Sequence, residues 1–361
     1  MSKKILLVDY PNPDGFAREK YLKQLGCEVY FYNLVKSRLW PGKNLVKERI
    51  KKVLSFLGSA NKITNKLDTY RLNKELLNTV REFRPDIILV IKGDSLFIDT
   101  LKTIRKIGSP LIINWYADSI LSPNRKEFIY SFMKLYDFFF LIDEIELLPL
   151  GIRKQIELIN KNVFTLPFAA NTEYYRPVEL SSDEKDEFHA EISFVGTINP
   201  VRKKVLEQLA NFNLKIWGPQ TSSWGDWLTP DSLLRNAYQK RCVFGSDVVK
   251  VYSISDIVLD IHFLYSLTSK IPNVTTRIYE VPASGGFVLT NNSPQLTKLF
   301  RVGEEIISYS NEKEIKKLIE YYLNNPEERK KVSLRGRERV LREHTYLQRL
   351  KMMFSLIERN G

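Results

Sequence analysis

The chain has 361 residues, of which 43% are hydrophobic and 27% charged, and its net charge at pH 7 is +13. These values are typical of a globular protein long enough for two domains, and they exclude a disordered or fibrous chain. Two cysteines, Cys27 and Cys242, are too few for a disulfide framework or a four-ligand metal site, which favours a reducing compartment. The most apolar stretch, residues 131–152, carries five charged side chains and is not expected to span a bilayer. No secretion signal precedes the first apolar run, so we expect a cytoplasmic location.

The positive charge indicates an anionic partner. Part of it is concentrated in residues 36–75, where eleven Lys and Arg face three Asp and Glu. One interpretation is a solvated helical face. The other is a surface that meets an anionic acceptor, or anionic lipid at the inner face of the membrane. No motif for groove or base recognition accompanies the charge, so a specific nucleic-acid partner is not expected.

Short apolar runs alternate with helical patterns through the first half of the chain. This alternation predicts right-handed crossovers between parallel strands, and therefore a doubly wound α/β sheet. The expected strands are residues 4–10, 27–33, 87–94, 111–118 and 136–143, and the expected helices are 16–25, 43–57, 68–83, 97–107 and 128–135.

The second half repeats this pattern after a break. Residues 166–177 read as a loop and residues 181–191 as a polar, acidic stretch, and we interpret both as an interdomain linker. The strands then expected are 191–197, 214–218, 258–263, 285–290 and one within 304–309, with helices at 200–211, 275–283, 312–323, 326–340 and 346–359. Ligands of doubly wound sheets bind beyond the carboxyl ends of the strands, so strand ends are the places to search.

The turn after strand 191–197 is the first candidate site. Gly196-Thr197 allows a ligand to approach the backbone, and Arg202 and Lys203 follow in the first turn of the next helix. Positive charges oppose the helix dipole there, and their position is explained if they meet a phosphate. The alternative is an ordinary strand–turn–helix with solvated basic side chains. Gly285-Gly286 would permit a tight helix-to-strand turn and another close ligand approach.

Three further positions in this half have two interpretations each. Trp217-Gly218 ends a strand, and the tryptophan either borders a base or sugar or belongs to the core. His262 follows an apolar strand and either faces the cleft or is packed. Glu280 lies in an otherwise apolar helix, where a carboxylate needs a partner. That partner is either the ribose of a nucleotide or the nearby Arg277.

Carboxylates also end strands in the first half. Asp118 closes a buried strand beside Trp115 and Tyr116, and we favour it as a base or a ligand of the acceptor. Asp9 and Asp94 are interpreted as turn or helix-cap residues. Each of the three follows a predicted strand, so all would lie at the same edge of the sheet.

Signatures of several other enzyme classes are missing from the sequence. It contains no GxxxxGK[ST], HExxH or GxSxG motif, no cluster of Cys and His, and no GxGxxG after the first strand. ATPases, zinc hydrolases and simple dehydrogenases are therefore disfavoured. No DxD pair closes a strand, which also disfavours a metal-dependent sugar transferase of the single-domain type.

The chain resembles the group-1 glycosyltransferases, and more closely their CgeB-like branch. The resemblance runs over most of the chain and rests on the order and spacing of several segments. They are WYAD (115–118), YDFFFLID (136–143), LPFAANTEYYRP (166–177), FVGTINPVRKKVLEQL (194–209), TRIYEVPASGGFVLT (276–290), GEEIISY (303–309), YYLNNPEER (321–329) and REHTYLQR (342–349).

The resemblance implies the GT-B fold, in which two Rossmann-like domains face a cleft. Residues 1–172 would form the acceptor domain, joined by the last helix, 345–361, which crosses back to it, and residues 173–344 would bind the donor. The implied reaction moves a sugar from a nucleotide-diphosphate sugar, UDP-sugar in the first instance, to an acceptor hydroxyl, without metal or other cofactor. The acceptor would be a saccharide, a lipid-linked molecule or a protein, in the synthesis of cell-surface polysaccharide, glycolipid or glycoprotein.

The family pattern also assigns roles to residues. Glu280 matches the second glutamate of its Glu-x7-Glu motif, which holds the donor ribose, and Arg202 and Lys203 match the positions that bind the diphosphate. With Asp118 as the catalytic candidate, the expected donor-binding residues are Gly196, Thr197, Arg202, Lys203, Trp217, Gly218, His262, Asn273, Thr276, Arg277, Glu280, Ser284, Gly285 and Gly286.

One position departs from that pattern. Pro272 stands where the first glutamate of the motif would contact the transferred sugar, and Asn273 or Thr275 are candidates to replace it. The sugar is therefore open, and so is the stereochemistry: a base at Asp118 favours inversion, and retention follows without one. Two alternatives stand beside the transferase: a non-catalytic spore or surface protein that keeps the fold, and a sugar-nucleotide epimerase.

Overall fold

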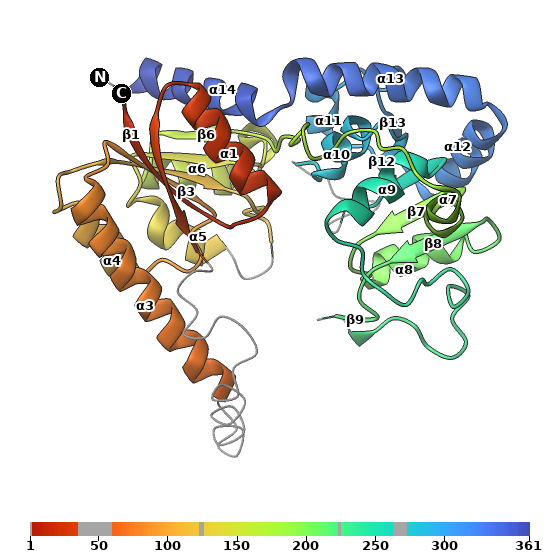
Figure 1. The fold of residues 1–361 in the computed structure, drawn as a ribbon, viewed down its shortest axis with the longest axis horizontal. Coiled ribbons are helices and arrows are strands. Elements are labelled where there is room, and N and C mark those ends of the chain that lie inside the picture. Colours follow the sequence, from red (N-terminus) through yellow and green to blue (C-terminus); the bar gives the residue numbers. More distant parts are fainter. Residues whose placement is uncertain (1, 35–59, 123–125, 223–224, 263–272) are drawn as a thin grey trace. The chain divides into compact units, whose positions relative to one another are not determined.

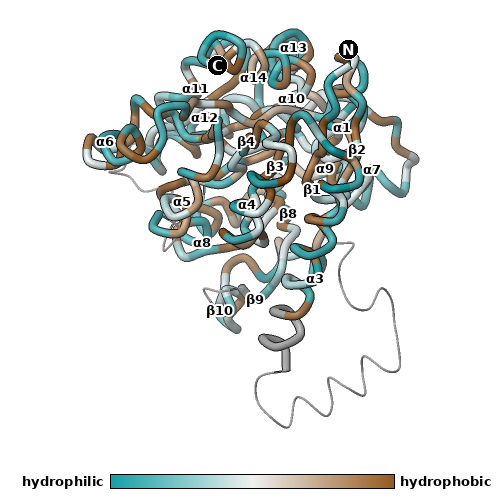
Figure 2. The backbone as a smooth tube through the Cα atoms, turned by 90° about the vertical axis from the view of Figure 1, so that its left-hand side faces the viewer, coloured by the Kyte–Doolittle hydropathy of each residue, from teal (hydrophilic) through white to brown (hydrophobic). Residues whose placement is uncertain are grey.

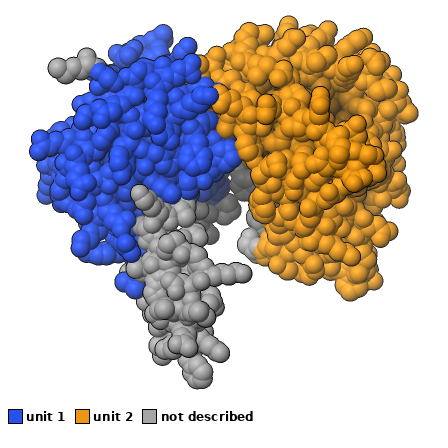
Figure 3. Space-filling model, in the orientation of Figure 1, with its two compact units in different colours: residues 1–142, 149–166, 350–361 blue, residues 143–148, 167–349 orange. Residues whose placement is uncertain are grey.

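The computed structural model describes residues 2–34, 60–122, 126–222, 225–262 and 273–361. They divide into two compact units (Figure 3): unit 1 comprises Met1–Ile142, Pro149–Leu166 and Leu350–Gly361, and unit 2 comprises Asp143–Leu148 and Pro167–Arg349. Unit 1 therefore ends six residues earlier than the expected boundary at 172. The hydrogen bonds explain this position, because the amide of Leu166 donates to Leu141 in unit 1, whereas the amide of Ala170 donates to His344 in unit 2.

Unit 1 contains a sheet of six parallel strands in the order β2-β1-β3-β4-β5-β6 (Figure 1). The strands are β1 (Lys4–Asp9), β2 (Glu28–Asn33), β3 (Ile87–Ile91), β4 (Leu111–Tyr116), β5 (Phe138–Leu141) and β6 (Val163–Thr165). Every residue of β3 is buried, as is typical of a parallel strand covered on both faces. The sequence analysis did not predict β6, whose three residues are only partly buried and give a weak apolar signal.

The helices of unit 1 connect these strands. They are α1 (Pro13–Gln24), α3 (Ala60–Phe83), α4 (Ile98–Ile104), α5 (Lys126–Met133) and α6 (Leu150–Ile159), together with most of α14 (Tyr346–Asn360). Helix α1 begins earlier than expected, because the Asn12 side chain accepts a hydrogen bond of 2.8 Å from the amide of Gly15 and caps the helix. Figure 2 shows β1 and β3 in the brown of apolar residues. The expected helix at 43–57 lies outside the described residues.

Unit 2 contains a five-stranded parallel sheet in the order β13-β12-β11-β7-β8. The strands are β7 (Ile192–Val195), β8 (Leu214–Trp217), β11 (Ile257–Asp260), β12 (Val288–Asn291) and β13 (Ile307–Tyr309), beside a small antiparallel pair, β9 (Thr221–Ser222) and β10 (Gly225–Asp226). The chain moves outward from β7 to β8 and then returns to the other side of β7 at β11. This reversal of direction is the switch point at which doubly wound sheets bind ligands, and the expected α/β class is confirmed.

Helices of unit 2 enclose two apolar clusters, one of which contains residues of α8 and α12 and the other residues of α9 and α10. The helices are α7 (Ser182–Phe188), α8 (Pro200–Glu207), α9 (Ser246–Ile254), α10 (Arg277–Ala283), α11 (Pro294–Leu299), α12 (Glu312–Asn324) and α13 (Pro326–Glu343), with a 3-10 turn, η1, at Ile145–Leu147. The interpretation of 181–191 as a linker was wrong. Ser181 and Glu184 form a capping box that starts α7, and Phe188 is buried in the second cluster.

The described part of the chain contains no helix that is both long and apolar enough to cross a membrane.

Candidate functional site

The carboxyl edge of the unit 2 sheet brings together most of the expected donor-binding residues. Gly196 follows β7, Gly218 follows β8 and His262 follows β11 by two residues. Helix α10 starts at Arg277, which reaches both β7 and β11 through its side chain. The switch point between β7 and β11 is therefore the centre of the candidate site.

Two glycines allow the loops after β7 and β8 to pack backbone against backbone. Gly196 has a φ of +148°, and a Cβ there would lie 2.6 Å from Nη2 of Arg277. A Cβ on Gly218 would overlap with the carbonyl oxygen of Gly196. The Gly196 amide donates to the carbonyl of Trp217 at 2.9 Å, which fixes the two loops to each other. Only glycine fits at these positions.

Asp260, the last residue of β11, accepts more side-chain hydrogen bonds than its neighbours in the candidate site and connects several of its elements. Its carboxylate is fully buried and accepts hydrogen bonds from Thr275 Oγ1 at 2.7 Å and from Thr290 Oγ1 at 2.9 Å. It also accepts a bond of 3.2 Å from Nη1 of Arg277. Tyr309 donates to the carbonyl oxygen of the same residue at 2.9 Å. The sequence analysis missed Asp260, although a carboxylate that ends an apolar strand was the signal used for Asp118.

Arg277 links the strands on either side of the switch point. Besides its ion pair with Asp260, it donates from Nη2 to the carbonyl oxygen of Val195 at the end of β7. Burial lowers its pKa, but Tyr252, Asp260 and Glu280 raise it, and the net direction is upward. Its guanidinium group is therefore directed to Asp260 and Val195, while partly buried Glu280 lies one turn further along α10 and acts on it electrostatically.

Arg202 is the second cation of the site. It is 8% exposed and donates to the carbonyl oxygens of Ile261 at 2.9 Å and Thr197 at 2.7 Å. Burial and the charge of Arg277 lower its pKa to about 10, so the group stays charged at neutral pH. The guanidinium carbons of both arginines lie over the ring of Phe194, at 5.5 and 5.7 Å from its centre. Arg202 was expected to bind a phosphate, but in this structure its side chain stabilises the loop after β7 through these hydrogen bonds.

The start of α8 offers less to an anion than the sequence indicated. The Asn199 side chain accepts the amide of Arg202 at 2.8 Å, and Pro200 has no N–H to give. Lys203 lies 3.7 Å from Glu207 in a partly exposed pair. Any anion at this edge would therefore depend on side-chain charge more than on free helix amides.

His262 is a packed, neutral histidine. It is 4% exposed, its amide donates to Asn291 Oδ1 at 2.9 Å, and burial lowers the pKa of its imidazole to about 4. Among the charges that act on it, Asp260 raises this pKa, whereas Arg202 and Arg277 lower it. The imidazole of His262 is therefore under the influence of two positive groups, Arg202 and Arg277, and one carboxylate, Asp260.

Asn273 is also buried, and its Nδ2 donates to the buried carboxylate of Asp143 at 2.6 Å. This bond explains why the Asp143–Leu148 segment belongs to unit 2. Thr276 precedes α10 as its N-cap residue, and its carbonyl oxygen accepts the amides of Tyr279 and Glu280. Pro272 lies outside the described residues.

Two of the expected assignments need correction. Trp217 is 1% exposed and belongs to the apolar cluster beside α10, so it is a core residue and does not border a ligand. Ser284 and Gly285-Gly286 lie at the end of α10, directly before β12, and therefore at the amino edge of the sheet, opposite Gly196. A Cβ on Gly286 would overlap with the carbonyl oxygen of Tyr252 at the end of α9, so this glycine serves helix packing.

A second polar cluster lies at the carboxyl edge of unit 1. Lys92 Nζ is 3.4 Å from Asp118 and 3.7 Å from Asp94, and Tyr116 donates to Asp94 at 3.3 Å. Asp118 also accepts the amide of Ser119 at 2.9 Å. The side chains of Lys92, Asp94 and Asp118 are partly exposed, as a contact with substrate requires, whereas Tyr116 is buried.

Asp9, in contrast, is fully buried in an ion pair with Arg18 at 2.7 Å. Its role is structural.

The described residues contain no group of three or more His, Cys, Asp or Glu that could hold a metal ion.

Residues 202–355 match the family described as glycosyl transferase-like. Most of this range lies in unit 2, and its first residue is Arg202. The chain has the GT-B fold, and this C-terminal part of it is similar to that family. The expected fold and the resemblance to glycosyltransferases are confirmed, and both agree with the expected enzyme class.

One curated protein and several solved structures are also similar to this chain. The chain is 23% identical over 271 residues to spore protein CgeB of Bacillus subtilis, a match that covers 72% of this chain and 78% of CgeB. Sucrose-phosphate synthase from Thermosynechococcus elongatus has a similar fold, with a TM-score of 0.67, 12% identity and coverage of 99% and 100% of the two chains. HepE of Anabaena, in complex with UDP and glucose, gives a TM-score of 0.60 at 12% identity and covers 99% of each chain.

Proposed function

We propose that unit 2 binds a nucleotide-diphosphate sugar, with UDP as the nucleotide, at the switch point between β7 and β11. The observation that carries this proposal is the pair of guanidinium groups, Arg202 and Arg277, of which only Arg277 is paired with the buried carboxylate of Asp260. An anion at this edge would balance the excess positive charge. The complex of the structurally similar HepE with UDP and glucose supports the choice of ligand.

The chemistry follows from these charges. In the proposed reaction the bond between the anomeric carbon and the diphosphate oxygen breaks, and an acceptor oxygen forms a new bond to that carbon. The acceptor proton passes to a base, and the diphosphate leaves with an additional negative charge. Arg202, Arg277 and Lys203 would stabilise that charge, which is why we propose a reaction without metal or other cofactor. Glu280 would accept hydrogen bonds from the ribose hydroxyls.

Calorimetric titration with UDP tests the donor site. Glu280→Ala should weaken UDP binding by roughly tenfold or more, because a carboxylate that accepts hydroxyl hydrogen bonds contributes about 1.5–3 kcal/mol. Glu338→Ala is the matched control, since Glu338 is an exposed glutamate on α13 of the same unit. If the wild-type protein bound none of UDP, GDP, ADP and dTDP, the proposal would be wrong.

We propose Asp118 as the base that takes the acceptor proton. Its carboxylate is partly exposed beside Lys92, at the edge of the sheet where ligands of doubly wound units bind. Asp118→Asn should reduce the rate of sugar transfer by about 10²–10⁴-fold and leave UDP affinity unchanged. Asp99→Asn, on an exposed carboxylate of α4, is the control. A base at Asp118 corresponds to inversion, which NMR of the product anomer reports directly.

The acceptor is proposed to be a saccharide, a lipid-linked molecule or a protein, reached by a cytoplasmic protein in peripheral contact with anionic membrane. The support is the charge of residues 36–75; residues 36–59 lie outside the described residues, and the remainder lies in α3. Sedimentation with vesicles that contain anionic lipid should show binding that decreases with salt. Equal binding to zwitterionic vesicles would contradict the membrane contact.

A non-catalytic role is the second candidate, and the similarity to spore protein CgeB is the observation that favours it. It predicts UDP binding without turnover on any acceptor. NMR of a UDP-sugar incubated with the protein alone separates both roles from epimerisation, because an epimerase would change the sugar without an acceptor.

A further inference from the structure

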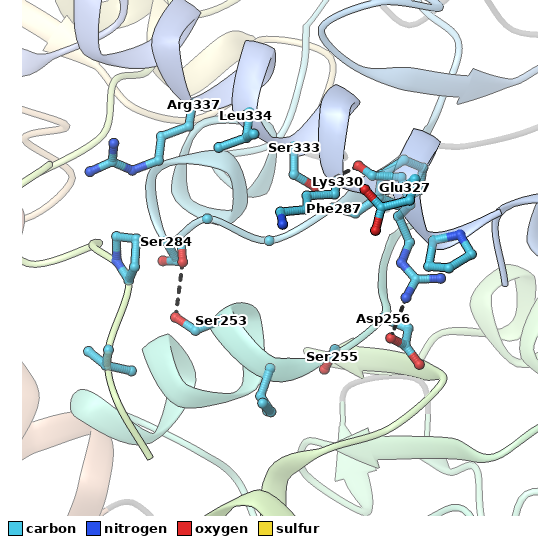
Figure 4. A pocket seen from close by; sticks show the side chains of 17 residues that line it. Ser253, Ser255, Asp256, Ser284, Phe287, Glu327, Lys330, Ser333, Leu334 and Arg337 are labelled. Atoms are coloured by element: carbon cyan, nitrogen blue, oxygen red, sulfur yellow. Dashed lines mark hydrogen bonds and ion pairs between the residues drawn. The ribbon is translucent and has the colours of Figure 1, made fainter.

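A cavity lies in unit 2, at the amino edge of the sheet and away from the candidate donor site. Its volume is about 690 Å³, which is within the range of small-molecule sites. The walls are the last turn of α9, the Ser284–Gly286 turn after α10, one face of α13 and residues 177–178 (Figure 4). The proposed transfer reaction uses none of these residues.

The side of the cavity formed by α13 is cationic. Pro326, Lys330, Ser333 and Arg337 recur at intervals of three and four residues, so they form one stripe along the helix. Gly336 brings α13 close to its neighbours, because a Cβ there would overlap with the carbonyl oxygen of Glu305. Figure 4 shows Lys330 reaching from this helix toward the turn after α10, and Arg337 extending along the left edge of the cavity.

Neither of these two cations forms an ion pair with another described residue, and the Nε of Arg337 is buried without a hydrogen-bond partner. A buried donor without an acceptor is rare in folded proteins and indicates a missing partner. Arg329, in contrast, is neutralised by Asp256 at 2.6 Å. Glu327, in the first turn of α13, is the remaining carboxylate of the lining.

The opposite side offers acceptors. Three serine hydroxyls line it, and each donates its proton to a backbone carbonyl, so each oxygen has lone pairs available for a ligand. They are Ser253, Ser255 and Ser284. The ends of α9 and α10 add carbonyl groups, whose partial negative charge favours hydrogen-bond donors. One side thus suits an anion and the other suits hydroxyl groups.

We propose that this cavity is a binding site for a small phosphorylated sugar or polyol, distinct from the donor site. The phosphate would contact Lys330 and Arg337, and the hydroxyl groups of the ligand would donate to the serine oxygens. This inference does not depend on sugar transfer, because all the residues that carry it lie at the amino edge of the unit 2 sheet.

Titration of the full chain with ribose 5-phosphate, followed by NMR or calorimetry, tests the proposal. Saturable binding is expected, and the double variant Lys330→Gln/Arg337→Gln should weaken it by about tenfold or more, because charge-assisted hydrogen bonds are lost. The matched control is Lys331→Gln/Arg335→Gln, which removes two exposed charges from the same helix outside the cavity. Ribose without phosphate should bind more weakly than ribose 5-phosphate.

Three results would overturn the proposal. They are no saturable binding of ribose 5-phosphate at millimolar concentrations, equal losses in the two double variants, and displacement of the ligand by UDP. The last would place the ligand in the donor site. Failure of UDP binding in the wild-type protein, by comparison, would overturn only the proposed donor site and would leave this cavity open to the same titration.

Discussion

Replacement of Asp260 by asparagine tests whether a single carboxylate holds the switch point together. Asp260 is fully buried and accepts hydrogen bonds from Thr275, Thr290 and Arg277, with the charge of Arg202 also nearby. Asparagine keeps the shape and one acceptor oxygen but removes the negative charge that pairs with Arg277 and acts on Arg202. Loss of one partner from a buried ion pair costs about 3–5 kcal/mol, and the retained acceptor favours the lower end of that range.

For a unit of this size, a loss of about 3 kcal/mol should lower the melting temperature by roughly 6–12 °C. Asp256→Asn is the matched control, because Asp256 directly precedes the same strand at its other end. Its pair with Arg329 is partly exposed, so its removal should lower the melting temperature by less than about 4 °C. Hydrogen exchange at increasing temperature, measured on peptides of unit 2, reports the change, with β3 and β4 of unit 1 as the internal reference. A shift in Asp260→Asn no larger than that in Asp256→Asn would refute this account of the site.

Two further outcomes can be measured. Gly218→Ala should reduce UDP affinity and stability together, because its Cβ would overlap with the Gly196 carbonyl. The control Gly151→Ala, in open space on α6, should leave UDP binding unchanged. Equal UDP affinity in the two variants would contradict the described packing of the loops after β7 and β8. Burial holds the pKa of His262 at about 4, below the ordinary value of about 6.5, so the unfolded chain binds more protons and stability should decrease as pH falls from about 6.5 toward 4. The free energy of unfolding should fall by about 3 kcal/mol over this range. His262→Asn should make it less dependent on pH, whereas His189→Gln should not. An unchanged pH profile in His262→Asn would count against a neutral buried histidine.

The sequence predicted most elements of both sheets and the position of the loop at Gly196, because alternating apolar runs and glycine turns are local signals. It did not predict which groups that loop meets. Asp260 carried the same signal as Asp118, a carboxylate at the end of an apolar strand, but its importance comes from partners 15 and 30 residues away. Its partners Thr275 and Thr290 join it only through the fold.

The misplaced residues have physical explanations as well. Gly285-Gly286 and Glu280 are close in sequence, but a crossover helix starts at one edge of a parallel sheet and ends at the other, so the two glycines line the cavity at the amino edge and Glu280 does not. Trp217 was ambiguous because strands of a parallel sheet are buried on both faces, which leaves no alternation to show where a side chain points. The acidic run at 181–191 resembled a linker because Phe188 is the one large apolar residue in it.

The discontinuity of unit 1 has a consequence for the order in which the protein is made. Residues 350–361 belong to unit 1, and Leu350, Met353 and Ile357 of α14 are buried. During synthesis these residues emerge only after all of Pro167–Arg349, a delay of roughly 10–40 s at typical translation rates. Throughout that interval the apolar surface that α14 will cover on unit 1 is open to solvent. Unit 1 is therefore the first unit to begin synthesis and the last to be completed. Chaperone binding to the nascent chain should concentrate on unit 1.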